Sequence, residues 1–208
     1  MSCREDKLRE LRENTPTIFA PNCWGGITYH HLGLEFCSPL INMHEPEEDY
    51  LRFLSDPEHY ISQDIKLREM YSDNEHKEPF PVAMMGDIEL WMNHYNDFDK
   101  AKEAWDRRKA RIKWDNLFVM FFTEDPERVD RFLSLPYKKK VCFVPWRTDK
   151  EGCLPVPYRE QEKLQRYPFW EIINNLALGD FVLYDDVELL YDCRYVKIGN
   201  IVKEIVRQ

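Results

Sequence analysis

Hydrogen-bonding and very small residues stand together after one short apolar segment, Thr17–Ala20, that ends at Pro21. The next five positions form a segment that we call the ligand loop: Asn22, Cys23, Trp24, Gly25 and Gly26. Glycine allows a ligand to approach the backbone closely. Open α/β sheets bind ligands where strands end, and the first N–H groups of a helix attract anions. The loop therefore predicts a phosphate or sugar site, and a structural turn with a packed tryptophan is the alternative interpretation.

Cys23 is the one nucleophilic side chain of the ligand loop. A thiol at the start of a helix can be activated by the positive end of that helix. Most free cysteines pack as small apolar residues, however, and the local sequence fixes no base beside Cys23. We therefore expect Cys23 to contact a ligand without acting as a covalent nucleophile. A Cys-dependent acyltransferase or hydrolase is the weaker alternative.

Asp87, Glu89 and His94 form a second group that can do chemistry. Alternation along residues 88–92 places Asp87 and Glu89 on one face of a strand, with an imidazole shortly after it. Such a set can hold a divalent ion or act as acid and base. A turn-capping aspartate and an ordinary hydrogen-bonding histidine are the alternative. We assign catalytic roles to Asp87 and His94, ligand contact to Tyr95, and no metal site.

A basic helix is predicted over about residues 99–113. Within residues 100–113, seven basic side chains outnumber two acidic ones, so this segment carries +5 while the rest of the chain carries −14. A solvated helix face is the usual explanation. Arg108, however, shares one helix face with Trp105 and Ile112, so its stem should point inward. A buried guanidinium needs a partner, which would be Asp87 or a bound anion; Arg108 and Arg111 are the predicted ligand contacts.

Composition limits the class of protein. The 208 residues are 43% hydrophobic and 14% aromatic, enough for a full core, and we expect one domain over residues 1–208. A net charge of −9 argues against nucleic-acid binding. The six cysteines match no zinc spacing, and no run of 18 apolar residues occurs. We expect a cytoplasmic protein that does not span a membrane, and the sequence identifies no cofactor.

The elements that position these residues follow from apolar patterning. Strands are expected at 17–20, 81–85, 88–92, 117–122 and 140–145, and helices at 2–13, 46–54, 99–113, 126–134 and 168–178. Thr123 is the expected cap of the helix 126–134. The strand, helix and strand over 117–145 make a βαβ unit. This order predicts an α/β fold: a mainly parallel mixed sheet with helices on both faces and the ligand loop after the first strand.

Four segments carry weaker signals. Leu40–Ile41 is read as a short strand, and residues 56–77 as a surface connection with about one helical turn. Gly152–Pro157 is expected to be a proline-punctuated loop. Residues 180–208 are apolar without one dominant period, which predicts a mixture of helix and strand.

Several motifs in order resemble an uncharacterised bacterial family, the domain of unknown function 1919. They are Asn22-Cys-Trp-Gly-Gly26, Gly86-Asp87, His94-Tyr95 and Trp105-x-x-Arg108-x-x-Arg111-Ile112. The likeness runs from about residue 15 to residue 145, with Ala20-Pro21 where the family usually has serine and asparagine. The resemblance implies an α/β fold and, from the label that members often carry, a part in exopolysaccharide synthesis. It supplies no established activity or catalytic residue.

The expected function combines this resemblance with the candidate sites. We expect a protein of cell-surface polysaccharide synthesis, a transferase that binds a nucleotide-sugar or a phosphorylated glycan precursor through the ligand loop and the basic helix. The alternative from another class is a non-catalytic binding or assembly protein. In either case the predicted partner is a small anionic or sugar-containing molecule.

Overall fold

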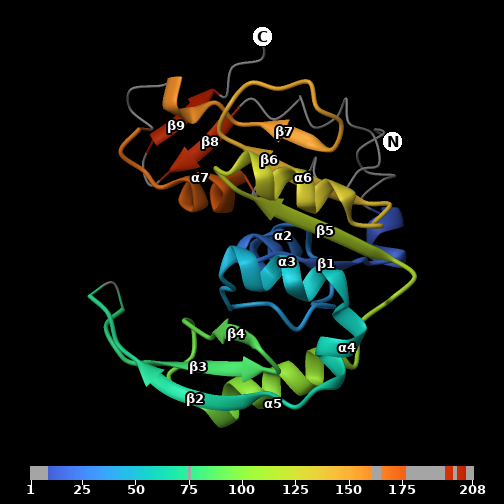
Figure 1. Cartoon of the computed structure of the whole chain (residues 1–208), viewed down its shortest axis with the longest axis vertical. Helices are drawn as coiled ribbons and strands as arrows, with labels where there is room; N and C mark the ends of the chain where they lie inside the picture. Colours follow the sequence, from blue (N-terminus) through green and yellow to red (C-terminus); the bar gives the residue numbers. More distant parts are fainter. Residues whose placement is uncertain (1–8, 75, 161–164, 177–194, 199–200, 205–208) are drawn as a thin grey trace.

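A four-stranded parallel sheet carries the ligand loop at one of its edges (Figure 1). The computed structural model describes residues 9–74, 76–160, 165–176, 195–198 and 201–204. The sheet has the order β1-β5-β6-β7, and each neighbouring pair is parallel. Its strands are β1 (Thr17–Phe19), β5 (Leu117–Phe122), β6 (Lys140–Val144) and β7 (Cys153–Pro155). The unbroken apolar run of β5 fits a strand covered on both sides.

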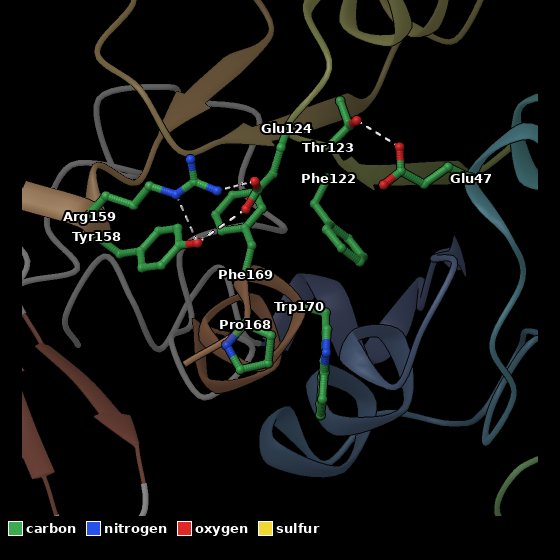
Figure 2. A pocket seen from close by; sticks show the side chains of 9 residues that line it. All are labelled: Glu47, Phe122, Thr123, Glu124, Tyr158, Arg159, Pro168, Phe169 and Trp170. Atoms are coloured by element: carbon green, nitrogen blue, oxygen red, sulfur yellow. Dashed lines mark hydrogen bonds and ion pairs between the residues drawn. The ribbon is translucent and has the colours of Figure 1, made fainter. Parts of the chain in front are cut away.

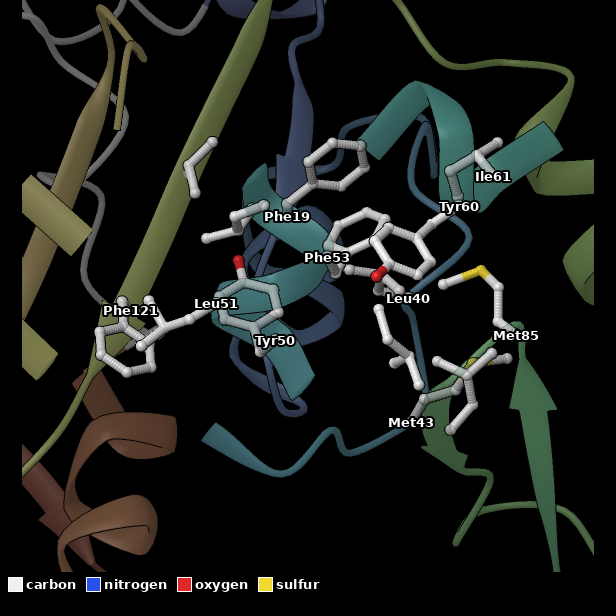
Figure 3. Close-up of a cluster of buried hydrophobic side chains, with 14 of the residues drawn as sticks. Phe19, Leu40, Met43, Tyr50, Leu51, Phe53, Tyr60, Ile61, Met85 and Phe121 are labelled. Carbon is white, nitrogen blue, oxygen red and sulfur yellow. The ribbon is translucent and has the colours of Figure 1, made fainter. Parts of the chain in front are cut away.

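Successive side chains of β1 and β5 enter two different hydrophobic clusters, because side chains alternate along a strand. Ile18 and Phe118 pack in a cluster with residues of α2 (Trp24–Leu32) and α7 (Phe169–Leu176). Phe19 and Phe121 pack in the other, with residues of α3 (Glu47–Ser55) and α6 (Pro126–Ser134). Figure 3 shows the labelled Phe19 and Phe121 beside the aromatic rings of α3.

The remaining strands before α5 make a separate antiparallel sheet in the order β2-β3-β4, which lies at one end of the long axis of the molecule (Figure 1). They are β2 (Lys66–Tyr71), β3 (Phe80–Met85) and β4 (Ile88–Trp91), and α5 (Phe98–Lys109) follows. The predicted α/β class is correct, but the single mixed sheet is not. Gly86 has a φ of 65° in the tight turn after β3, and so short a turn can only join antiparallel strands.

The structure differs from the sequence prediction at three segments. Two edge strands were not predicted, and one predicted strand is a turn. All but the last residue of β2 is exposed, so no apolar alternation marked it within the predicted connection 56–77. That connection also contains α4 (Pro57–Ser62). Gly152–Pro157, predicted as a loop, contains β7, whose Pro155 is tolerated on an edge strand. Leu40–Ile41 lies in a turn, not in a strand.

Helix ends follow their capping residues. The Asp97 side chain accepts a hydrogen bond from Lys100 N at 2.9 Å and so begins α5. Asp125, rather than the predicted Thr123, caps α6 by accepting from Glu127 N at 2.9 Å. The Thr123 hydroxyl instead accepts from Asp125 N at 3.1 Å.

The two ends of the chain are described in part. Helical turns cover 9–13 of the predicted helix 2–13, and the rest of that helix lies outside the described residues. In the C-terminal region, β8 (Tyr195–Ile198) and β9 (Ile201–Glu204) pair antiparallel, and the other positions of 180–208 lie outside the description. Among the described helices, none has the length and apolar character needed to cross a bilayer.

Candidate functional site: a cysteine–histidine pair between the two sheets

The ligand loop, predicted as a loop over residues 22–26, runs into the first turn of α2 and is helical from Trp24 onward. Cys23 occupies the N-cap position of α2, and the helix begins at Trp24. The Asn22 Oδ1 atom accepts a hydrogen bond from Trp24 N at 3.1 Å, which fixes the turn into the helix. A Cβ atom at Gly25 would lie 3.3 Å from the Cβ of Ala20. A side chain at position 25 would crowd Ala20, so glycine favours this close approach of helix and strand, and the thiol stands at the positive end of α2.

The thiol of Cys23 meets the imidazole of His94. The Cys23 Sγ atom is 2.9 Å from His94 Nε2, although the two residues are 71 positions apart. His94 follows β4 of the antiparallel sheet, whereas Cys23 follows β1 of the parallel sheet. The local sequence fixes no base beside Cys23, but the fold brings an imidazole to the thiol from a distant segment.

Backbone hydrogen bonds hold the two sides of this pair together. His44 and Trp91 exchange N–H···O bonds of 2.8 and 2.9 Å, which attach the end of β4 to the segment before α3. Glu45 N donates to the carbonyl of Pro21 at 3.0 Å, which attaches the same segment to the ligand loop. Residues 44 and 45 thus connect the segment that carries Cys23 to the segment that carries His94. Neither residue was identified from the sequence as part of a site.

Burial keeps both members of the pair neutral. Desolvation raises the pKa of the Cys23 thiol, and the charge of Glu45 adds to that rise. Desolvation also lowers the pKa of His94, and His76 contributes in the same direction. In a neutral pair the thiol S–H donates to the unprotonated Nε2, so the imidazole proton is on Nδ1. His94 is exposed and Cys23 is half-buried, so an outside molecule can reach the pair.

Buried polar atoms without hydrogen-bond partners surround the pair. Glu45 is 1% exposed, and neither of its carboxyl oxygens has a partner among the described residues. The same holds for Asn22 Nδ2 and Asn93 Oδ1, which belong to the neighbours of Cys23 and His94 in the sequence. Burial raises the pKa of Glu45 well above its ordinary range, because desolvation disfavours the charged carboxylate. Such unsatisfied groups are rare in native structures and often mark functional sites.

Arg108 points inward, as predicted, but its partners are neutral. Its Nη1 atom donates to the Ile41 carbonyl at 3.1 Å and to the Tyr95 hydroxyl at 3.0 Å. In the described part of the chain, no carboxylate forms an ion pair with Arg108. Tyr95 directly follows His94, so the guanidinium is attached to the segment that carries the base. Two of the residues predicted as ligand contacts, Tyr95 and Arg108, are therefore brought together.

Asp87 is placed away from this pair. Its carboxylate accepts from Tyr60 at 3.0 Å and pairs with Arg52 at 3.3 Å, with its side chain 67% exposed. Asp87 precedes β4 and His94 follows it, so the two lie at opposite ends of that strand. A strand rises about 3.3 Å per residue, or about 13 Å from Asp87 to Trp91. Of the two partners considered for Arg108, a bound anion or Asp87, the fold therefore does not provide Asp87.

The other charged candidates are paired on the surface. Glu89 accepts from the Trp91 indole at 2.9 Å and pairs with Arg68. Arg111 pairs with Glu35 at 3.6 Å. Lys102 contacts Asp64 and Asp106, and Lys109 also contacts Asp106. The described residues contain no group of three side chains that could hold a metal ion.

Comparisons with known proteins identify a family and one relative. A family model described as a domain of unknown function (DUF1919) matches residues 2–184. A Haemophilus influenzae protein described as uncharacterised is 31% identical over 139 residues, which is 65% of this chain and 65% of the relative. The matched part is thus less than two thirds of the relative, and neither description includes an activity.

Proposed function

The chain belongs to the family of the domain of unknown function DUF1919, and we propose that it is a thiol-dependent acyltransferase or hydrolase in which Cys23 is the nucleophile and His94 the base. The observation that carries this proposal is the 2.9 Å contact between Cys23 Sγ and His94 Nε2 at the start of a helix. A nucleophile within hydrogen-bond reach of a base is the arrangement that covalent catalysis requires.

The proposed reaction has two steps: acylation of Cys23, and transfer of the acyl group to an acceptor or to water. Cys23 Sγ attacks the carbonyl carbon of an ester or thioester while its proton passes to His94 Nε2. The bond to the leaving group then breaks, and the leaving group takes that proton. A hydroxyl of the acceptor, or water, next attacks the Cys23 thioester as Nε2 accepts the hydroxyl proton. The carbon–sulfur bond breaks, and the proton returns to the sulfur.

The surroundings supply what these steps need. The N-terminus of α2 and the Nδ2 group of Asn22 offer partial positive charge where the oxyanion develops. Burial favours the protonated form of Glu45, and in that form its carboxyl can donate a hydrogen bond. Because the thiol is neutral at rest, its reactivity depends on His94 as general base rather than on a resting thiolate.

The expected part in surface-polysaccharide synthesis belongs to the same proposal, with a glycan hydroxyl as the acyl acceptor. The half-buried guanidinium of Arg108, which has only neutral partners in the described chain, supports a donor that carries phosphate. Arg108→Ala should then weaken binding of a phosphate-bearing thioester such as acetyl-coenzyme A by about tenfold or more. Acylation by an uncharged ester should be unchanged, and equal effects on both donors would contradict this role.

The pH dependence of acylation tests the pair. Wild-type protein is treated with p-nitrophenyl acetate, and acetylation of the Cys23 peptide is followed by mass spectrometry from acid to alkaline pH. The wild-type rate should be lost as pH falls through the pKa of His94, which lies below its ordinary value, and stay level across neutral pH. His94→Gln should react about 10²–10⁴-fold more slowly at pH 7, and its rate should rise only as the thiol ionises at alkaline pH.

A matched control uses Cys37→Ser, because Cys37 is a buried cysteine away from the pair and should not alter the profile. If His94→Gln acylates as fast as wild type, or if Cys23 takes up no acetyl group, the thiol mechanism is wrong. The non-catalytic binding or assembly protein would then be the better assignment.

A further inference from the structure

A pocket of about 380 Å³ opens beyond the end of β5, on the side of the parallel sheet where strands end (Figure 2). Its volume falls within the range of about 300–1,000 Å³ typical of small-molecule sites. The lining combines aromatic and polar side chains from β5, α3, η1 (Tyr158–Glu160) and α7. The proposed thiol chemistry uses none of these side chains.

One wall of the pocket is a fixed aromatic cluster with one exposed ring. Phe169 stacks on Tyr158 with ring centres 5.4 Å apart and an interplanar angle of 11°, and meets Phe122 edge-on at 6.0 Å. These three residues are each less than 8% exposed, whereas the neighbouring Trp170 is 48% exposed. An indole held open beside a pocket offers a flat, electron-rich face to polarised C–H groups.

The polar lining consists of carboxylates that are already paired. Glu124 accepts from the Tyr158 hydroxyl at 3.1 Å and pairs with Arg159. On the other side, Glu47 accepts from the Thr123 hydroxyl at 2.7 Å and from Arg128 at 2.9 Å. Each carboxylate thus has a guanidinium partner. The dashed lines in Figure 2 mark the contacts of Glu124 with Tyr158 and Arg159 and of Glu47 with Thr123.

The exposed aromatic ring and the paired polar side chains of the pocket together favour one class of ligand. A phosphate would face two carboxylates and a guanidinium that is already engaged, and an apolar ligand would bury these polar groups without compensation. A sugar ring has an apolar C–H face and, at its edge, hydroxyls that both donate and accept. We propose that the pocket binds an uncharged sugar residue, stacked on Trp170 and hydrogen-bonded to Glu124 and Arg159.

Calorimetric titration tests this proposal with the methyl glycosides of glucose, galactose, mannose and N-acetylglucosamine. At least one should bind saturably to the wild-type protein. Trp170→Ala should weaken that glycoside at least about tenfold, which corresponds to roughly 1.4 kcal/mol. Glu124→Gln should weaken it to a similar degree, because a neutral amide accepts hydrogen bonds less strongly than a carboxylate.

Trp114→Ala is the matched control, since Trp114 is also partly exposed, at 38%, but does not line the pocket. The affinity of Trp114→Ala for the glycoside should equal that of the wild-type protein. Cys23→Ser should also bind normally, which separates this proposal from the thiol chemistry. The proposal is overturned if no glycoside binds up to about 50 mM, if Trp170→Ala binds as wild type does, or if inorganic phosphate competes with the glycoside.

Discussion

Cys23 and His94 owe their contact to the backbone around them. The segment 44–45 pairs with Trp91 on one side and with Pro21 on the other, so the sulfur and the ring nitrogen are placed by main-chain hydrogen bonds. Main-chain placement explains how two side chains that are not both buried can keep a 2.9 Å separation. We therefore expect substitution of either side chain to leave the surrounding fold intact.

Glu45 leads to a prediction about stability and pH. Its folded pKa lies well above the ordinary value, so between the unfolded and folded pKa values the folded state binds more protons than the unfolded state. Stability should therefore fall as pH rises through that window. Glu45→Gln, which does not titrate, should lack this fall and be more stable than wild type at pH 8 by about 1–3 kcal/mol. The measurement is urea unfolding from pH 4.5 to pH 8.

Glu58→Gln is the control, because Glu58 is exposed and should leave the wild-type slope intact. A Glu45→Gln protein whose stability declines with pH as steeply as wild type would show that Glu45 is ionised in the fold.

Only part of the site could be predicted from single residues. Asn22, Cys23 and His94 stood out by type, and Arg108 by its place on the same helix face as Trp105. The pairing of Cys23 with His94 was out of reach, because it depends on a long-range bridge through residue 44. Glu45 gave no signal, since nothing local indicates that its carboxyl is buried.

At the scale of elements, β1 and α2 position the thiol. Within the described sheet β1 pairs with β5 alone, so its other edge is open. The hydroxyl of Tyr29, from the last turns of α2, accepts from Ile18 N at 2.7 Å and donates to the Pro16 carbonyl at 2.8 Å. The helix thus completes the hydrogen bonding of the strand that precedes it.

Tyr29→Phe tests this arrangement. The substitution leaves the Ile18 N–H and the Pro16 carbonyl without that partner in a buried place, so the free energy of unfolding should fall by about 1–3 kcal/mol. Tyr71→Phe is the control, because the Tyr71 hydroxyl makes no hydrogen bond within the described residues while its ring packs on Phe80. If the two variants have equal urea midpoints, the hydroxyl of Tyr29 does not support β1.

Strands could be predicted where their burial produces a recognisable apolar pattern in the sequence. The run Leu117–Phe122 and the alternation of Ile88–Trp91 gave β5 and β4, since apolar side chains mark the faces that are covered. The exposed β2 and the short β7 lacked this mark. The division into two sheets also could not be foreseen, because partner choice depends on tertiary pairing rather than on the pattern within one strand.

At the scale of the whole molecule, the pair lies where the parallel sheet and the antiparallel sheet come together. Cys23 follows a strand of one sheet and His94 follows a strand of the other, so the contact between them depends on both sheets keeping their places. The shared hydrophobic cluster around Phe19, Tyr50 and Met85 joins them (Figure 3). Arg128 and Arg131 of α6 add ion pairs to Glu48 of α3 at 2.8–2.9 Å.

The most direct test of the Cys23–His94 pair is turnover of an acetyl thioester with enzyme in catalytic amount, combined with acid quenching and peptide mass spectrometry. Wild type should release more than one equivalent of free thiol and carry an acetyl group on Cys23 in the quenched sample. Cys23→Ala should give neither, and His94→Gln should be slower by about 10²–10⁴-fold. Turnover that survives in Cys23→Ala, or a wild-type protein that neither turns over nor acquires the acetyl group, would contradict the assignment.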